Sequence, residues 1–244
     1  MKTTIRWGHQ TDVGMVRRVN QDAVMANGNV FVVADGMGGH QGGEVASDIT
    51  TTYFAEMGEV ATVEQLEQAV ITANAKIRER GATQSNLDGM GTTVVAIAVL
   101  PPDEPGGPLH FAAANVGDSR LYLLEDGALR QVSVDHSLVE ELVRAGQITA
   151  KEAEHHPQRN VVTRALGADR TVDVDTWVLR SQVGQRYLLC SDGLVNEVPN
   201  AKVIAVLQDT PSPKEAADKL VELANNAGGR DNTSVLIVDV VESG

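Results

Sequence analysis

The stretch VADGMGGHQGGEVAS, residues 33–47, carries five glycines in fifteen positions and directly follows an apolar run. Glycine is favoured where the backbone must approach another group closely or adopt a positive φ. A P-loop would need a lysine at position 44 to reach a phosphate, and Glu44 stands there instead. The stretch contains no G-x-G-x-x-G pattern either. It therefore does not predict a loop that cradles phosphate directly.

Asp35 in this stretch suggests a metal ligand. It follows the apolar run Val30–Ala34, and the next residue is Gly36, whose backbone carbonyl has no neighbouring Cβ to crowd it. A carboxylate beside a carbonyl oxygen suits a hard cation such as Mg²⁺ or Mn²⁺. An isolated Asp-Gly pair is usually only a turn, so this position alone does not decide between the two interpretations.

Three further aspartates occur in the same context, each at one end of an apolar run and beside glycine or a small polar residue. They are Asp118 in NVGDSR, Asp192 in LLCSDG and Asp231 in GGRDNTS. Four unrelated turns remain the alternative to a cluster at one edge of a β-structure. Metal ions held by such a cluster would stabilise an attacking hydroxide and the charge that develops on a phosphoryl group.

A phosphoryl substrate also needs a positively charged partner, and Arg17 in VRRVNQD is the candidate. A planar guanidinium can bind two phosphate oxygens at once. The alternative for Arg17 is an ordinary solvated surface arginine.

Apolar and β-branched runs predict the strands, and amphipathic spacing predicts the helices. The expected strands are Val30–Val33, Thr92–Leu100, Leu109–Val116, Leu121–Leu124, Leu129–Val132, Val174–Leu179, Tyr187–Cys190 and Val235–Val241. The expected helices are Glu44–Met57, Thr62–Ile77 and one that begins at Ser212-Pro213. Together they favour an α+β fold with helices layered on antiparallel sheets. We expect the strands from Leu109 to Val132 to form an antiparallel meander.

We expect a single domain over residues 1–244, because the Pro/Gly-rich stretch 101–108 is short enough to be a loop between strands. Residues 138–165 have short helical patterns but little apolar periodicity, which indicates an insertion lying over the surface. Cys190 is the single cysteine, so no internal disulfide can form. It lies in an apolar run and is expected to be a buried small hydrophobe.

Composition excludes several classes of protein. The formal net charge of −13 argues against a nucleic-acid-binding surface, which needs clustered Lys and Arg. No signal-peptide pattern and no apolar segment of membrane-spanning length is present. The lone cysteine fits a reducing compartment, and we expect a soluble, cytoplasmic protein without membrane contact.

The ordered motifs resemble the PP2C (PPM) family of metal-dependent serine/threonine protein phosphatases, and its bacterial branch in particular. The resemblance extends from about residue 8 to 240, essentially the whole chain. Its motifs are R-x-x-N-Q-D at 17–22, V-A-D-G-M-G-G-H at 33–40, G-T-T at 91–93, N-V-G-D-S-R at 115–120, D-H-S at 135–137, R-A-L-G at 164–167, C-S-D-G at 190–193 and G-R-D-N-T-S at 229–234.

The resemblance implies a central antiparallel β-sandwich flanked by pairs of helices, an αββα arrangement with Mn²⁺ or Mg²⁺ ions at one end. Asp35 would bridge two ions, with the Gly36 carbonyl on one of them. Asp192 and Asp231 would complete the second position. Asp118, together with Asp192, would hold a third, more weakly bound ion.

The resemblance also implies roles for residues around the metals. Arg17 would bind the substrate phosphate, and Asp22 would order metal-bound waters. Residues 138–165 would form a flap near the site. Many eukaryotic members carry a histidine directly after the Asp-Gly pair as the general acid, but Met37 stands there in this chain. That leaves His40 or water to supply the proton.

The implied reaction is hydrolysis of phosphoserine and phosphothreonine by a metal-bridging hydroxide, without a phosphoenzyme. Partners would be phosphorylated Ser/Thr proteins, including a Ser/Thr kinase and its targets, and we expect a monomer. Two alternatives remain. One is a catalytically silent module that binds phosphoproteins, and the other is a metal-dependent hydrolase of small phosphoesters. A cysteine phosphatase is excluded because that class needs an arginine six residues after the cysteine, and position 196 is Asn.

Overall fold

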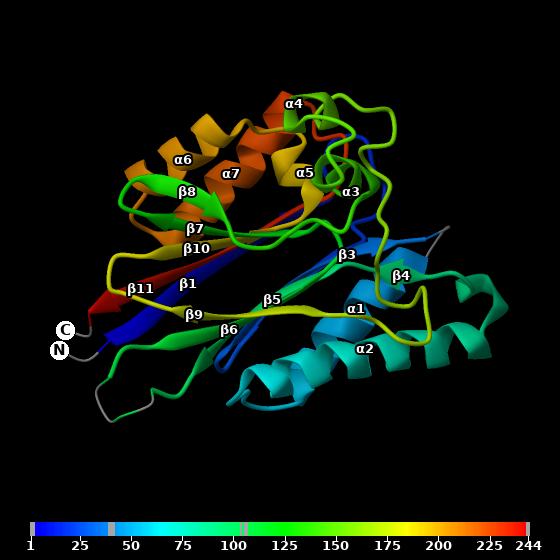
Figure 1. Cartoon of the computed structure of the whole chain (residues 1–244), viewed down its shortest axis with the longest axis horizontal. Coiled ribbons are helices and arrows are strands. Elements are labelled where there is room, and N and C mark those ends of the chain that lie inside the picture. The colour runs from blue at the N-terminus through cyan, green and yellow to red at the C-terminus, as the bar shows by residue number, and fades with distance from the viewer. Residues whose placement is uncertain (1–2, 39–41, 103, 105–106, 243–244) are drawn as a thin grey trace.

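The computed structural model describes residues 3–38, 42–102, 104 and 107–242 (Figure 1). Two antiparallel sheets stack face to face, and helices cover the outer face of each. The first sheet has the order β1 (Thr3–Asp12), β11 (Thr233–Glu242), β10 (Arg186–Cys190), β7 (Arg120–Glu125) and β8 (Ala128–Gln131). The second has the order β2 (Asp22–Asn27), β3 (Val30–Met37), β5 (Val94–Leu100), β6 (His110–Val116) and β9 (Asp175–Arg180), with β4 (Gly91–Thr92) paired to β3.

The helices divide between the two outer faces. α1 (Gly42–Glu56) and α2 (Val63–Thr83) cover the second sheet, and α6 (Asn200–Asp209) and α7 (Pro213–Ala227) cover the first (Figure 1). The shorter elements are η1 (Ser85–Leu87), α3 (Leu138–Arg144), α4 (Ala150–Ala153) and α5 (Asp192–Val195). The expected four-layer αββα arrangement is confirmed.

Successive side chains of each strand point to opposite faces of its sheet, and this produces three core layers. In β3, Phe31 and Val33 pack between the two sheets, whereas Val30 and Val32 pack beneath α1 and α2. In β10, Leu189 faces the other sheet, whereas Leu188 packs beneath the helices of its own sheet. A strand with both faces buried needs apolar residues at every position, which explains the continuous apolar runs in the sequence.

The two ends of the described chain lie side by side. β1 and β11 form a long antiparallel ladder that runs from the pair Thr3–Glu242 to the pair Asp12–Thr233. Asp231 lies just beyond the second of these pairs. The ladder therefore joins the chain ends at one end of the sandwich to a candidate metal ligand at the other.

The expected meander is wrong at its first turn. β6 pairs with β5 and β9, whereas β7 pairs with β8 and β10, so residues 117–119 carry the chain from one sheet to the other. Gly117 permits this crossing with a φ of +108°, and a Cβ there would come within 2.5 Å of the Thr93 side chain. The hydroxyls of Ser119 and Thr93 also lie 2.7 Å apart. Asp118 is therefore placed where the two sheets are joined.

Helix boundaries follow their capping residues. The Thr62 hydroxyl accepts a hydrogen bond from the Gln65 amide at 3.2 Å, and α2 continues beyond Ile77 to Thr83. The Ser212 hydroxyl caps α7 in the same way. Within the described ranges, no helix combines the length and the apolar character that a membrane crossing requires.

Candidate metal centre

Asp22 and Asp35 form a carboxylate pair across two neighbouring strands. They lie opposite each other in the β2–β3 ladder, so their side chains lie on the same face of the sheet. Asp22 is buried, and its Oδ2 accepts a hydrogen bond of 2.8 Å from the Ser191 hydroxyl. Among the described residues, its buried Oδ1 has no hydrogen-bond partner. A buried acceptor without a partner costs free energy of folding, so this oxygen is a place where a further hydrogen-bond donor can bind.

The other three candidate aspartates reach this place from different elements. Asp118 lies on the crossing after β6, Asp192 is the first residue of α5, and Asp231 lies just before β11. The Asp192 carboxyl accepts a hydrogen bond of 3.0 Å from the Asn196 side-chain amide.

Burial and mutual repulsion raise the pKa of several of these carboxylates. Burial raises the pKa of Asp35 well above its usual range, and the charges of the other four aspartates raise it further. Burial and neighbouring carboxylates also raise the pKa of Asp22 and of Asp118 to about 7. Burial, followed by the charge of Asp231, raises the pKa of Asp192. Like charges held together this way favour either protonation or a bound cation.

The donor set fits a hard divalent cation. Asp35, Asp118 and Asp192 are partly exposed, so an ion from solvent can reach them. Gly36 packs so tightly that a Cβ would come within 2.2 Å of the Gly43 carbonyl oxygen. Carboxylate and carbonyl oxygens are the ligands that Mg²⁺ and Mn²⁺ prefer.

The role of these carboxylates as ligands is not fixed by their present geometry. Across the described part of the chain, no group of three or more His, Cys, Asp or Glu side chains is positioned as a formed metal site. Asp231 is paired with the Arg17 guanidinium at 2.7 Å. The assignment of these residues as metal ligands therefore stays a prediction.

We expect metal stabilisation of this protein to depend steeply on pH. An aspartate whose pKa is higher in the folded state than in the unfolded state adds stability at low pH, and this is lost as pH rises from about 4 to about 7. Asp22 and Asp118 have this shift. A cation that displaces their protons or offsets their charge reverses the loss. The gain in melting temperature on adding Mn²⁺ should thus be small at about pH 5 and grow towards about pH 8. A gain that is constant across this range would contradict the prediction.

Arg17 lies at the edge of the aspartate cluster. Its Nη2 donates a hydrogen bond of 2.7 Å to Asp231 Oδ2, and about half of its side chain is exposed. The surrounding segment is fixed by Asn232, whose amide donates to the Val13 and Val19 carbonyl oxygens at 2.9 and 3.0 Å. The same side chain accepts a bond of 2.8 Å from the Gln21 amide. Asn232 directly follows Asp231, so these bonds anchor both ends of the segment that carries Arg17 beside that aspartate.

His136 contacts the residue that precedes Asp118. Its neighbour Ser137 caps α3 with its hydroxyl. The His136 ring accepts a 3.0 Å hydrogen bond at Nδ1 from the Gly117 amide. The His136 amide donates to the Gly117 carbonyl oxygen, also at 3.0 Å. His136 therefore supports the turn that carries Asp118, a contact that the D-H-S motif gave no means to predict.

Two other expectations concern possible proton donors and nucleophiles. His40 lies outside the described residues. Cys190 is buried as expected, and burial raises the pKa of its thiol to about 12. At neutral pH this sulfur is therefore a protonated core atom and not a nucleophile.

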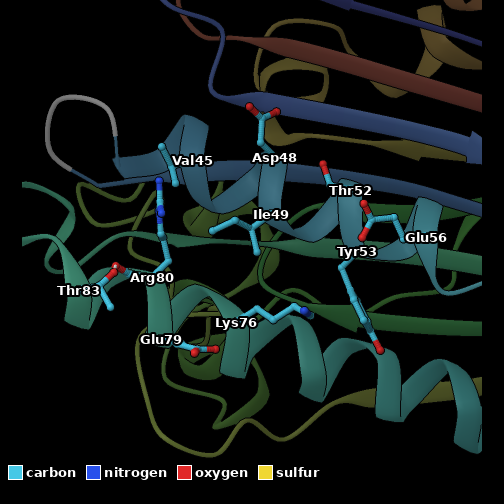
Figure 2. A pocket seen from close by; sticks show the side chains of 10 residues that line it. All are labelled: Val45, Asp48, Ile49, Thr52, Tyr53, Glu56, Lys76, Glu79, Arg80 and Thr83. Carbon is cyan, nitrogen blue, oxygen red and sulfur yellow. Dashed lines mark hydrogen bonds between the residues drawn. The ribbon is translucent and has the colours of Figure 1, made fainter.

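A groove of about 620 Å³ lies apart from the aspartates, between α1 and α2 (Figure 2). Figure 2 shows Tyr53 extending from α1 towards α2, and the Lys76 ammonium lies 5.2 Å from the centre of its ring. Of the candidate site residues that the structure describes, none lines this groove.

The motif order and the aspartate cluster agree with comparisons to known proteins. A family model described as protein phosphatase 2C matches residues 16–225. The chain belongs to the protein phosphatase 2C family. A serine/threonine phosphatase stp of Listeria innocua is 39% identical, with 94% of each chain covered. The serine/threonine protein phosphatase PstP of Mycobacterium tuberculosis is 38% identical over 98% of this chain and 45% of its own length.

Solved structures of this family show the same fold. The crystal structure of M. tuberculosis PstP/Ppp superposes with a TM-score of 0.90 at 37% identity, covering 98% of this chain and 99% of that one. A PstP catalytic domain in complex with 2 manganese ions gives a TM-score of 0.88 at 36% identity, covering 99% and 100%. The resemblance to the PP2C family is confirmed.

Proposed function

We propose that this PP2C-family chain is a metal-dependent protein phosphatase that hydrolyses phosphoserine and phosphothreonine in proteins. The observation that carries the proposal is the placement of Asp22 and Asp35 opposite each other in the β2–β3 ladder, with the charges of Asp118, Asp192 and Asp231 acting on Asp35. The names of the relatives, which are serine/threonine phosphatases, support the substrate class.

The aspartates would hold Mn²⁺ or Mg²⁺. Asp35, the Gly36 carbonyl, Asp192 and Asp231 would hold two ions, and Asp118 with Asp192 would hold a third, weaker one. The PstP domain with 2 manganese ions supports the first two. When bound, the ions supply the Lewis acidity that activates water and offsets charge on the phosphoryl oxygens.

Arg17 is the phosphate-binding residue in this proposal. In the structure its guanidinium is paired with Asp231. When that carboxylate is engaged as a ligand, the guanidinium is free to donate to two phosphoryl oxygens. Arg17 thereby holds the phosphorus in line with the attacking water and stabilises the charge that builds up on the oxygens.

Asp22 and the proton donor complete the reaction. Asp22 Oδ2 is occupied by Ser191, so Oδ1 is the atom that accepts a proton or hydrogen bond from the water. The water oxygen bonds to phosphorus as the bond to the serine or threonine oxygen breaks, and the leaving oxygen takes a proton from His40 or from water. No covalent enzyme intermediate is needed, and the buried Cys190 thiol would be unsuited to form one.

We extend the proposal to the organisation of the chain. Residues 1–244 form one catalytic domain, and residues 138–165 form a flap within it. Support comes from α3 and α4, which contribute no buried residues, and from their position at one end of the sandwich near α5 (Figure 1). We also propose a monomer that acts in the cytoplasm on a Ser/Thr kinase and its targets, with the free Cys190 thiol consistent with a reducing compartment.

A substrate panel tests the function. Phosphoserine, phosphothreonine and phosphotyrosine peptides and nucleoside triphosphates are assayed for phosphate release with Mn²⁺ and with a chelator. We expect turnover of the first two peptides with Mn²⁺ only. Binding of phosphopeptides without turnover would indicate a silent phosphoprotein-binding module. Preferential hydrolysis of nucleotides would indicate a phosphoesterase of small molecules, and either result would overturn the proposal.

A further inference from the structure

The segment around Arg17 exposes apolar side chains beside the aspartate cluster. We call residues 13–21 the arginine loop. Met15 is 71% exposed and Val16 is 64% exposed, and Val19 is also exposed. Exposed apolar residues that stand singly are ordinary, but a group of them beside a binding site indicates contact with a partner.

The arginine loop is held in a fixed conformation. Asn232 binds it at Val13, Val19 and Gln21. The Met15 amide donates a hydrogen bond of 2.7 Å to the Gly229 carbonyl oxygen. These bonds fix the backbone of the loop on both sides of Met15 and Val16.

Met15 lies over the turn that leads to Asp231. A Cβ placed on Gly229 would come within 2.8 Å of Met15 Cγ, so only a glycine leaves room for this side chain. Val16 directly precedes Arg17, whose guanidinium reaches Asp231. Met15 therefore borders the turn that leads to Asp231, beside the place where the phosphoryl group would bind in the proposed function.

We infer that Met15 and Val16 form a docking surface for an apolar side chain next to the phosphorylated residue of the substrate. This inference rests on the proposed function. The Met15 amide binds the Gly229 carbonyl oxygen and the Arg17 guanidinium binds Asp231, so Met15 and Arg17 both lie along the turn 229–231. A peptide whose phosphate is held by Arg17 would therefore pass Met15 and Val16 with a residue that flanks the phosphorylated one. The surface selects phosphopeptides with an apolar residue beside the phosphoserine or phosphothreonine.

Two phosphothreonine peptides that differ only in the flanking residues test this inference. One has Leu on both sides of the phosphothreonine, and the other has Ser. We expect kcat/KM with Mn²⁺ to be about fivefold higher for the Leu peptide, as burial of about 40 Å² of apolar surface would give. In the double variant Met15→Ser/Val16→Ser this ratio should fall to about 1.

Val183→Ser is the matched control, because Val183 is 48% exposed and precedes Gly184, whose amide binds the Val240 carbonyl oxygen near the chain ends, at the other end of the sandwich. It should keep the parental ratio of the two peptides. An unchanged ratio in the double variant would overturn the inference. So would an equal loss for both peptides, which would indicate a structural role, or a changed oligomeric state at an unchanged ratio, which would indicate a contact between copies. Failure of the parent protein to hydrolyse either peptide would instead refute the proposed function.

Discussion

Asp192→Asn should lower phosphatase activity with Mn²⁺ by about a hundredfold or more, while the metal-free protein becomes at least as stable as the parent. The activity falls because the substitution removes a charged ligand and weakens the charge stabilisation that the cations supply. Stability is kept because Asn has nearly the same shape and its oxygen can still accept the bond from Asn196. One of the carboxylates that repel Asp35 and Asp231 is also gone.

The two halves of this prediction are measured separately. Turnover of p-nitrophenyl phosphate and of a phosphothreonine peptide is followed with Mn²⁺, and thermal unfolding is followed with a chelator. Asp48→Asn is the control, since Asp48 is an exposed aspartate on α1 that lines the groove away from the cluster. Near-parental turnover of Asp192→Asn with Mn²⁺ would rule out Asp192 as a metal ligand. A marked loss of metal-free stability would show that its role is structural.

Arg186→Leu should lower the free energy of unfolding by about 3–5 kcal/mol, because it leaves a buried carboxylate without its partner. Arg186 and Asp239 are only 9% and 7% exposed, and the guanidinium forms two bonds to the carboxylate of 2.6 and 2.7 Å. Arg186 also donates to the carbonyl oxygens of Leu207 and Thr210 at the end of α6, at 2.6 and 2.7 Å. The substitution therefore leaves these buried oxygen acceptors without a hydrogen-bond donor.

Arg6→Leu supplies the comparison at the same carboxylate. Arg6 lies 3.8 Å from Asp239, but its side chain is 58% exposed, so its contribution should stay within about 1 kcal/mol. Urea denaturation of the parent and both variants gives the two differences. The double variant Arg186→Leu/Asp239→Leu should recover much of the loss, because no buried charge is then unpaired. Equal effects of Arg6→Leu and Arg186→Leu would contradict this account.

The layered fold could be predicted from the sequence because burial on both faces makes strands such as Val94–Leu100 continuously apolar. Helix starts were predictable where a hydroxyl residue caps them, as Thr62 and Ser212 do. α6 was missed because its N-cap is Pro199, which offers no side-chain hydrogen bond to recognise. β1 was missed because its residues are mostly half-buried or exposed, so its composition has little apolar bias.

Some features of the candidate site could also be predicted from the sequence, and others could not. Asp35, Asp118, Asp192 and Asp231 could be singled out because a carboxylate at a strand end is a local signal. The prediction of a meander was wrong because the partners of β6 and β7 depend on which sheet each strand joins. A four-residue connection such as theirs can link two strands of one sheet or of two sheets. Asn232 acts on residues more than 200 positions away, and no local pattern reports such a contact.

The β1–β11 ladder has a practical consequence for handling the protein. Its paired positions run from Thr3–Glu242 to Asp12–Thr233, and ten residues of strand span about 33 Å. A tag, a surface attachment or a fused domain at either chain end would therefore hang at the far end of the sandwich from Asp231. Because the two ends are neighbours, a short linker could also join them, and new ends could be opened elsewhere without disturbing the aspartates.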